Sequence, residues 1–160
     1  METTIRPIQG REEIDVCARM MAGSEPWITL QRDYDASVQT LLSPGKEVYV
    51  AADGTQILGF IILNMQGGFT GYIQSIGVAP EWRSRGIGRR LVAYAEERIF
   101  REAPNVFICV SSFNAGAQRF YRSLGYEAIG ELKDFVVRGH SEILLRKTIA
   151  PWREFKKRSV

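Results

Sequence analysis

The sequence predicts an α/β domain built on a mixed, mostly antiparallel sheet of about seven strands with helices on both faces. Three β-branched and aromatic runs before residue 80 are joined by short glycine turns, which predicts an antiparallel meander. A strand, a segment of helical period and an apolar strand follow over 72–110, which predicts a parallel strand pair with a helical crossover. One short strand before these elements and two after them complete the count.

The first 45 residues are predicted to form one strand and two helices. We expect the strand over Thr3–Ile8 and the first helix over Glu12–Ala22, where apolar residues recur on one stripe. The second helix, Asp33–Leu42, has Asp33 as a natural N-cap and ends at a proline-glycine turn. The segment Gly23–Asp35 is unusual because it mixes acids with large aromatic residues.

Three strands are expected next, over Glu47–Ala52, Gln56–Met65 and Tyr72–Val78. Asp53-Gly54 is a strong hairpin signal between the first two, and Gly67-Gly68 marks the second reversal. The three strands are therefore expected to lie antiparallel, in the order of the chain.

The stretch Gly71–Ile99 is interpreted as strand, turn and helix. Proline ends the strand at Ala79-Pro80 because it cannot donate to a sheet ladder. The turn then carries two glycines and four arginines directly before a helix: Arg83, Arg85, Gly86, Gly88, Arg89 and Arg90. A helix N-terminus offers free N–H groups and partial positive charge, and glycine lets an anion approach the backbone. The turn therefore predicts a phosphate-binding site, against the alternative of a merely basic surface turn.

Two common phosphate-binding motifs are excluded. A P-loop needs Lys followed by Ser or Thr after its last glycine, and Gly88 is followed by Arg89-Arg90 instead. A dinucleotide fingerprint needs a third small residue where Leu91 stands, and an acid after the next strand, where Ser111-Ser112 stands. A nicotinamide cofactor is therefore a poor fit.

The last third of the chain is predicted to hold three strands and a helix. Val106–Val110 is a continuous apolar run, typical of a strand buried on both faces. Asn114 is a natural N-cap for a helix that ends at Gly125. Tyr126–Leu132 and Ser141–Thr148 are expected to pair as a hairpin.

Composition indicates an ordinary globular protein, with 45% hydrophobic and 24% charged residues among 160. We expect a single domain over 1–150 and a basic C-terminal tail over 151–160. No apolar run reaches the roughly 20 residues that cross a bilayer, and no signal-peptide pattern opens the chain. A cytoplasmic protein without a membrane partner is expected. The net charge of +3 is too mild to indicate nucleic-acid binding.

Metal catalysis and hydrolase chemistry are not indicated. His140 is the only histidine, and the two cysteines have no ligand spacing, so no metal is expected. A Gly-x-Ser-x-Gly elbow is lacking as well. Cys109 has no evident histidine base, so Cys17 and Cys109 are both expected to be buried thiols.

Two motifs resemble the signatures of the GNAT acetyltransferases. Arg83-x-x-Gly86-x-Gly88 is similar to the family's acetyl-CoA pyrophosphate loop, and Ile76-Gly77-Val78 to its bulged strand beside the acetyl group. The second motif is Asn114-x-x-Ala117-x-x-Phe120-Tyr121-x-x-x-Gly125-Tyr126. The two motifs cover Tyr72–Tyr126 in the family's order and spacing.

The resemblance implies the GNAT fold, N-acetyltransferase activity and acetyl-CoA as cosubstrate. It implies coenzyme contacts along the two motifs from Ile76, Gly77, Val78, Arg83, Ser84, Arg85, Gly86, Ile87, Gly88, Arg89, Asn114, Ala117 and Tyr121. Backbone N–H groups around Gly77-Val78, where the strand is expected to bulge, would hold the thioester carbonyl. Tyr121 would protonate the leaving sulfur, since a phenol stays protonated at neutral pH. The alternative is that Tyr121 is a packed aromatic residue whose hydroxyl meets a backbone group.

The general base is left open between Tyr72 and Glu25. Many GNAT members use a carboxylate on the strand before the phosphate loop, but Gly71–Ala79 contains no acid. Tyr72-Ile73-x-x-Ile76-Gly77 is similar to one N-terminal-amine acetyltransferase subgroup. In that subgroup a tyrosine here and a histidine on the next strand act through water, and Cys109 occupies the histidine's position.

The acceptor is expected to be a primary amine on a small molecule, peptide or protein. The resemblance implies that the segment Gly23–Asp35 borders the acceptor site, so Glu25 and Trp27 are candidate substrate-binding residues. Tyr72 is a third candidate, from its resemblance to the N-terminal-amine subgroup. An acid there would attract a cationic amine. The alternative is structural, with Asp33 capping the second helix and Trp27 stapling it.

Two other functions and one assembly stay open. The chain could be an acyl-CoA-binding sensor without catalysis. It could also associate with RNA through the Arg83–Arg98 helix and the basic tail, although stacking aromatic residues are not concentrated there. The chain could also assemble as a homodimer.

Overall fold

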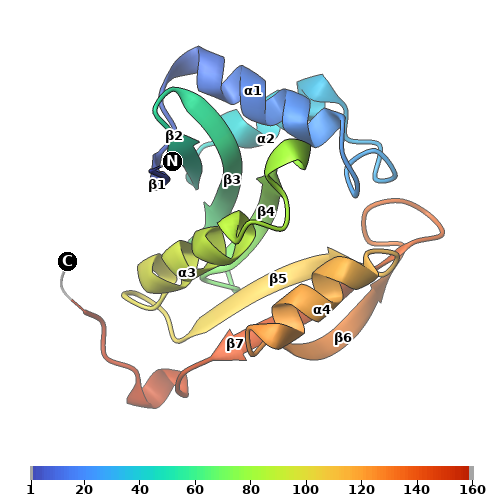
Figure 1. The fold of residues 1–160 in the computed structure, drawn as a ribbon. Helices are drawn as coiled ribbons and strands as arrows, with labels where there is room; N and C mark the ends of the chain where they lie inside the picture. Colours follow the sequence, from blue (N-terminus) through green and yellow to red (C-terminus); the bar gives the residue numbers. More distant parts are fainter. Residues whose placement is uncertain (1, 159–160) are drawn as a thin grey trace.

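The computed structural model describes residues 2–158 as a seven-stranded sheet with helices on both faces (Figure 1). The strands are β1 (Thr4–Pro7), β2 (Lys46–Asp53), β3 (Gln56–Asn64), β4 (Tyr72–Val78), β5 (Asn105–Ser111), β6 (Glu127–Lys133) and β7 (Ser141–Thr148). The helices are α1 (Gly10–Ala22), α2 (Tyr34–Leu42), α3 (Ile87–Ile99) and α4 (Ala115–Ser123), with short 3-10 turns η1 (Pro80–Trp82) and η2 (Trp152–Glu154). The predicted fold class is confirmed, and the predicted elements match within a few residues at each end.

The sheet order is β1-β2-β3-β4-β5-β7-β6, and every pairing is antiparallel except that of β4 with β5. The parallel pairing predicted for these two strands is confirmed, but it is short. It joins only Tyr72 with Phe107 and Ile73 with Ile108. Beyond Ile73 the two strands share no ladder, so the sheet opens there into two arms. This opening positions the functional site.

Each face of the sheet is covered by two helices (Figure 1). Helices α1 and α2 pack on a buried cluster that includes Val48, Val50 and Phe60. Helices α3 and α4 pack on the opposite face, on a cluster that includes Leu63, Leu91 and Tyr121. Successive strand residues point to opposite faces, which is why β2 and β3 feed both clusters and are apolar almost throughout.

The local signals for helix ends are confirmed. The Asp33 carboxylate accepts from the Ala36 N–H at 2.9 Å, and the Asn114 side chain accepts from the Ala117 N–H at 3.1 Å. Gly125 follows α4 with φ +95°, a left-handed conformation that glycine adopts without steric cost.

The prediction of a bulge at Gly77-Val78 is wrong, because the bulge in β4 lies elsewhere. The β3–β4 register shifts between the pairs Ile62–Ser75 and Leu63–Ile73, so the extra residue is Gln74. Gly77 pairs regularly with Phe60. Gly77 is required for packing, because an added Cβ would lie 2.6 Å from Phe60 Cε1 and 3.2 Å from Trp27 Cη2.

The prediction of two buried thiols is half right. Cys17 lies in the α1 core and is fully buried. Cys109 is only partly buried, because β5 turns it toward the opening between the two arms.

In the described residues, no helix is both long and apolar enough to span a membrane.

Candidate active site

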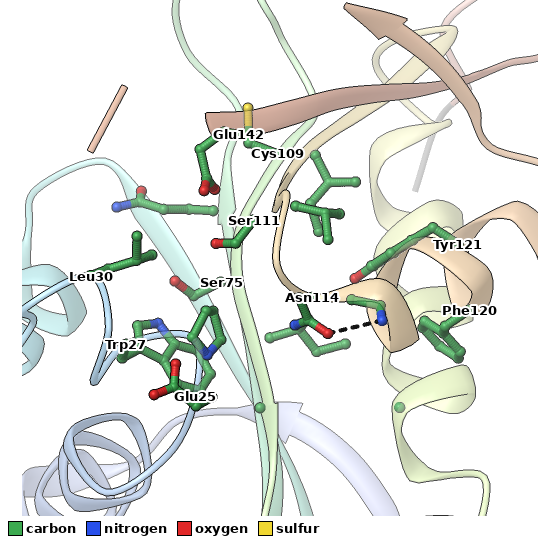
Figure 2. Close-up of a pocket in the computed structure, with 18 of the residues that line it drawn as sticks. Glu25, Trp27, Leu30, Ser75, Cys109, Ser111, Asn114, Phe120, Tyr121 and Glu142 are labelled. Carbon is green, nitrogen blue, oxygen red and sulfur yellow. Dashed lines mark hydrogen bonds between the residues drawn. The ribbon is translucent and has the colours of Figure 1, made fainter. Parts of the chain in front are cut away.

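A cleft of about 1710 Å³ fills the opening between the two arms. One wall comes from β4, the loop before α3 and the α1–α2 connection, and the other from β5, β7 and α4. Figure 2 shows side chains from both walls converging on it. The two predicted motifs, far apart in the sequence, therefore meet in one cavity.

The loop before α3 forms one end of the cleft. Ser84 and Gly86 both adopt left-handed conformations, with φ of +60° and +83°. Such conformations turn successive backbone N–H groups toward one side and make an anion-binding concavity. Gly86 is also the N-cap of α3, and nothing lies within 4 Å of the position that its Cβ would take. The predicted phosphate site therefore has the backbone geometry that it needs.

The four arginines of this loop and the first turn of α3 have different surroundings. Arg83 donates from Nε to the Val78 carbonyl oxygen at 3.2 Å, and Arg90 donates to the Thr3 carbonyl oxygen at 2.7 Å. Arg85 lies over the Trp82 ring, 4.9 Å from its centroid. Arg89 is exposed and lines the cleft, and its side chain makes no hydrogen bond within the described part of the chain. Arg89 is thus the arginine most available to a bound anion.

The edge of β4 that faces the cleft carries free amide groups. The Ala79 N–H donates to the Leu58 carbonyl oxygen at 2.8 Å, which continues the β3–β4 ladder. Successive N–H groups of a strand point to opposite edges, so the Gly77 N–H belongs to the ladder as well. The N–H groups of Ile76 and Val78 point the other way, toward the opening.

Tyr121 reaches the cleft from α4, together with Phe120 and the N-cap residue Asn114 (Figure 2). Ala117 also lines the cleft. Its side chain is only 2% exposed, and its hydroxyl has no hydrogen-bond partner. The expected alternative, a hydroxyl paired with the backbone, is therefore wrong. Burial raises the pKa of Tyr121 far above that of a free phenol, and the Glu96 carboxylate adds to the shift. The hydroxyl is consequently a proton donor at neutral pH.

Tyr72 and Cys109 lie together in the other half of the cleft, on the paired ends of β4 and β5. Burial raises the pKa of the Tyr72 phenol, and hydrogen bonding to Cys109 raises it further. Burial also raises the pKa of the Cys109 thiol, although Tyr72 opposes that shift. Both groups are therefore held in their protonated forms. A protonated phenol cannot accept a proton from the amine, so Tyr72 is poorly suited to act as the base.

Glu25 and Trp27 come from the α1–α2 connection and line the same cleft (Figure 2). The Glu25 carboxylate is exposed and accepts from the Thr29 hydroxyl at 3.0 Å. Trp27 is buried and packs against Phe60, with 6.0 Å between ring centroids. The segment therefore borders the cleft as expected. Trp27 packs on Phe60 of the sheet, so its role is not limited to a hydrophobic staple for α2.

Glu142 and Ser111 are cleft residues that the sequence reasoning missed (Figure 2). They are cross-strand partners on β7 and β5, and Glu142 is only 6% exposed. Burial raises the pKa of Glu142, while the Ser111 hydroxyl and the Arg32 guanidinium oppose the shift only in part. One signal was available: Glu142 directly precedes the apolar run Ile143–Leu145 of β7 and shares a face with Leu144.

Unsatisfied polar atoms concentrate in this cleft. In residues 2–158, seven buried side-chain atoms have no hydrogen-bond partner, and five of them belong to residues that line the cleft. These five are Gln74 Oε1, Trp82 Nε1, Ser111 Oγ, Tyr121 Oη and Glu142 Oε2. Buried polar groups are normally paired, so a cluster of exceptions is typical of a functional site, where water or a ligand supplies the partners.

Three exposed phenylalanines rim the cleft: Phe69, Phe113 and Phe135. They come from the β3–β4, β5–α4 and β6–β7 connections. Phe69 packs on Phe107, and Phe113 packs edge-on against His140.

No group of three or more candidate metal ligands occurs among the described residues.

Comparison with known proteins agrees with this geometry. The model of the acetyltransferase (GNAT) family matches residues 12–126. The N-alpha-acetyltransferase RimI of Mycobacterium tuberculosis is 30% identical over 116 residues, which is 71% of this chain and 69% of that protein.

Solved structures share the fold at lower identity. An aminoglycoside 6'-N-acetyltransferase complexed with coenzyme A has a TM-score of 0.75 and 22% identity, over 92% of this chain and 98% of its own. An acetyltransferase of Bacillus subtilis in complex with CoA has a TM-score of 0.75 and 16% identity, over 93% of this chain and all of its own.

Proposed function

The chain belongs to the GNAT acetyltransferase family, and we propose that it is an N-acetyltransferase that moves the acetyl group of acetyl-CoA directly to a primary amine. One observation carries the proposal. A single cleft joins an anion-binding loop to a buried tyrosine hydroxyl that has no protein partner. Such a cleft can hold a diphosphate at one end and protonate a leaving thiolate further along.

The coenzyme is proposed to bind along the β4 and α4 side of the cleft. The amides of the loop from Arg83 to Gly88 would hold its diphosphate, and Arg89 would add a charge-assisted contact. Fold neighbours complexed with coenzyme A support this choice of cosubstrate. Of the predicted coenzyme residues, Asn114 and Ala117 would act mainly through the backbone, because the Asn114 side chain already caps α4.

The chain's own groups account for each demand of the reaction. The Ile76 and Val78 amides point toward the opening and would stabilise the carbonyl oxygen as it becomes an oxyanion. The neutral amine forms the new N–C bond while the C–S bond breaks. The Tyr121 hydroxyl gives its proton to the departing sulfur and then regains a proton that the nitrogen sheds. No metal is needed for any of these steps.

The acceptor is proposed to be a peptide N-terminus, a lysine or a small amine. The RimI relative is named for N-alpha acetylation, and a fold neighbour is named for aminoglycoside acetylation. These names support an amine acceptor and do not choose among amines. We further propose that residues 1–150 form the catalytic domain, that 151–160 are a basic C-terminal tail, and that the enzyme works in the cytoplasm, in keeping with its two free cysteines.

A thiol-release screen tests the proposal. The full chain is mixed with acetyl-CoA and with peptides, acetylatable lysine, a polyamine or an aminoglycoside, and free thiol is followed over time. Thiol release that depends on one amine class supports N-acetyl transfer. Tight acetyl-CoA binding with no release on any amine would instead indicate a sensor, and no heat of acetyl-CoA binding in calorimetry would overturn both.

A further inference from the structure

The amine must lose a proton before it can attack, so the acceptor half of the cleft needs a base. A lysine-like ammonium has a pKa of about 10.4 and is almost fully protonated at neutral pH. This inference rests on the proposed N-acetyl transfer and concerns which residue takes that proton. The two sequence candidates are poorly suited. The Tyr72 phenol has its pKa raised by burial, and the Glu25 carboxylate is exposed and already accepts from Thr29.

Glu142 is placed differently from both. It lies on β7 next to β5, and its carboxyl points into the cleft beside Ser111 (Figure 2). The side chain is 6% exposed, and Oε2 has no hydrogen-bond partner. An incoming ammonium could therefore donate to this oxygen without displacing any protein group.

Among the residues that the structure describes, Glu142 does not stabilise the fold through an ion pair, as the other partly buried glutamates do. In residues 2–158, Glu13, Glu47 and Glu96 each form an ion pair at 2.7–2.9 Å, and Glu142 forms none. A buried carboxylate without a cation costs stability unless something else compensates. The groups that face it are Arg32 from the α1–α2 connection, Tyr72 from β4, and Cys109 and Ser111 from β5.

We propose that Glu142 is the general base, which takes a proton from the acceptor ammonium through Oε2 before the amine attacks the thioester. The ammonium N–H bond breaks, the Glu142 carboxylate becomes a carboxylic acid, and the freed lone pair forms the N–C bond. The C–S bond breaks as Tyr121 protonates the sulfur, and Tyr121 regains the second proton that the nitrogen sheds. Glu142 later releases its proton to solvent, so each turnover yields an amide, a thiol and one proton.

The base and the oxyanion donors would then lie on different arms of the opened sheet. The base comes from β7, which pairs with β5, and the oxyanion donors come from β4. Because β4 and β5 part beyond Ile73, an acceptor entering the opening passes between them. Burial makes Glu142 a stronger base than a surface carboxylate, because its pKa is raised.

Glu142→Gln tests the proposal in the full chain, with thiol release on the best amine from the screen. Loss of a general base is expected to lower kcat by about 100-fold or more. The acetyl-CoA dissociation constant should stay within about twofold, since Glu142 on β7 lies on the opposite wall of the cleft from the anion loop. The acid limb of the kcat/KM profile against pH should vanish in the variant. A weakly basic amine, already neutral at the assay pH, should show a much smaller loss.

Two controls make the result decisive. Glu131→Gln removes a carboxylate from the adjacent strand β6, where it is exposed and accepts from Ser141 at 2.7 Å, and should leave turnover unchanged. Glu25→Gln tests the rival base. Near-normal turnover of Glu142→Gln with an intact acid limb would overturn the assignment, as would an equal loss on both amine types. If the native chain releases no thiol on any amine, the proposed function itself fails, not only the base.

Discussion

Arg83 donates from Nε to the Val78 carbonyl oxygen at 3.2 Å, which ties the anion loop to the end of β4. The same guanidinium lies 3.4 Å from the Ser24 hydroxyl, at the start of the α1–α2 connection. The first residue of the coenzyme motif is thus a brace between three segments. Its contribution to ligand binding should come largely through the shape of the loop.

We therefore expect Arg83→Ala and Arg89→Ala to weaken acetyl-CoA binding in different ways. Arg89 is exposed and free, so its loss should cost about tenfold at low salt, or ~1.4 kcal/mol, and much less at high salt. Arg83→Ala should cost a similar factor that salt does not remove, because loop order is lost. Calorimetry at two ionic strengths measures both. An equal salt dependence for the two variants would contradict the bracing role.

Tyr121→Phe removes a buried hydroxyl that has no protein partner. We expect kcat to fall by about 10²-fold, the acetyl-CoA dissociation constant to change little, and the melting temperature to hold or rise. Tyr126→Phe is the matched control, because that hydroxyl donates to Glu96 at 2.8 Å. It should lower stability by ~1 kcal/mol and spare the chemical step. Unchanged thiol release by Tyr121→Phe would remove its role as acid.

Gly77→Ala and Gly88→Ala separate packing from ligand access. A Cβ at Gly77 would lie 2.6 Å from Phe60 Cε1, so we expect destabilisation of about 1–3 kcal/mol in urea unfolding. A Cβ at Gly88 meets nothing closer than 3.7 Å, and alanine favours a helix, so stability should be kept or gained. That methyl would still obstruct an anion near the loop, so acetyl-CoA binding should weaken. A stable Gly77→Ala with normal packing would contradict the structure.

Glu47→Gln should make stability depend less on pH. The Glu47 carboxylate accepts two hydrogen bonds from Arg98, at 2.8 and 2.7 Å, and links β2 to α3. Burial works to raise the pKa of Glu47, but hydrogen bonds from Arg98 and Tyr49 outweigh it and hold the pKa below the usual 4.5. A lowered pKa means that the charged form stabilises the fold above the unfolded pKa, and that this stabilisation is lost as pH falls.

The variant should therefore be about 1–3 kcal/mol less stable than the native chain near pH 7, and the difference should shrink on acidification below the usual carboxyl pKa. Urea unfolding at several pH values measures it. A difference that stays constant down to pH 3 would show that packing, not charge, explains the loss.

Much of this protein was determined by local signals in its sequence. Asp33 and Asn114 cap helices in the sequence and in the structure, because a cap depends on a side chain and a backbone group three residues away. Gly86, expected from the sequence to let an anion approach the backbone, lies at the N-cap of α3 with open space around its Cβ position. The two motifs, with strand, turn and helix around them, were enough to predict the fold class and the family.

The tertiary structure decided what depends on distant segments. The short β4–β5 ladder opens the cleft, and no local pattern reports where two strands stop pairing. The bulge lies at Gln74 and not at the predicted Gly77-Val78, because the pairing register of β4 is set by its partner strand β3. Cys109, expected to be buried, faces the opening instead. Glu142 becomes a buried, unpartnered carboxyl because β7 returns beside β5, 31 residues after Ser111, which is its partner across the pair.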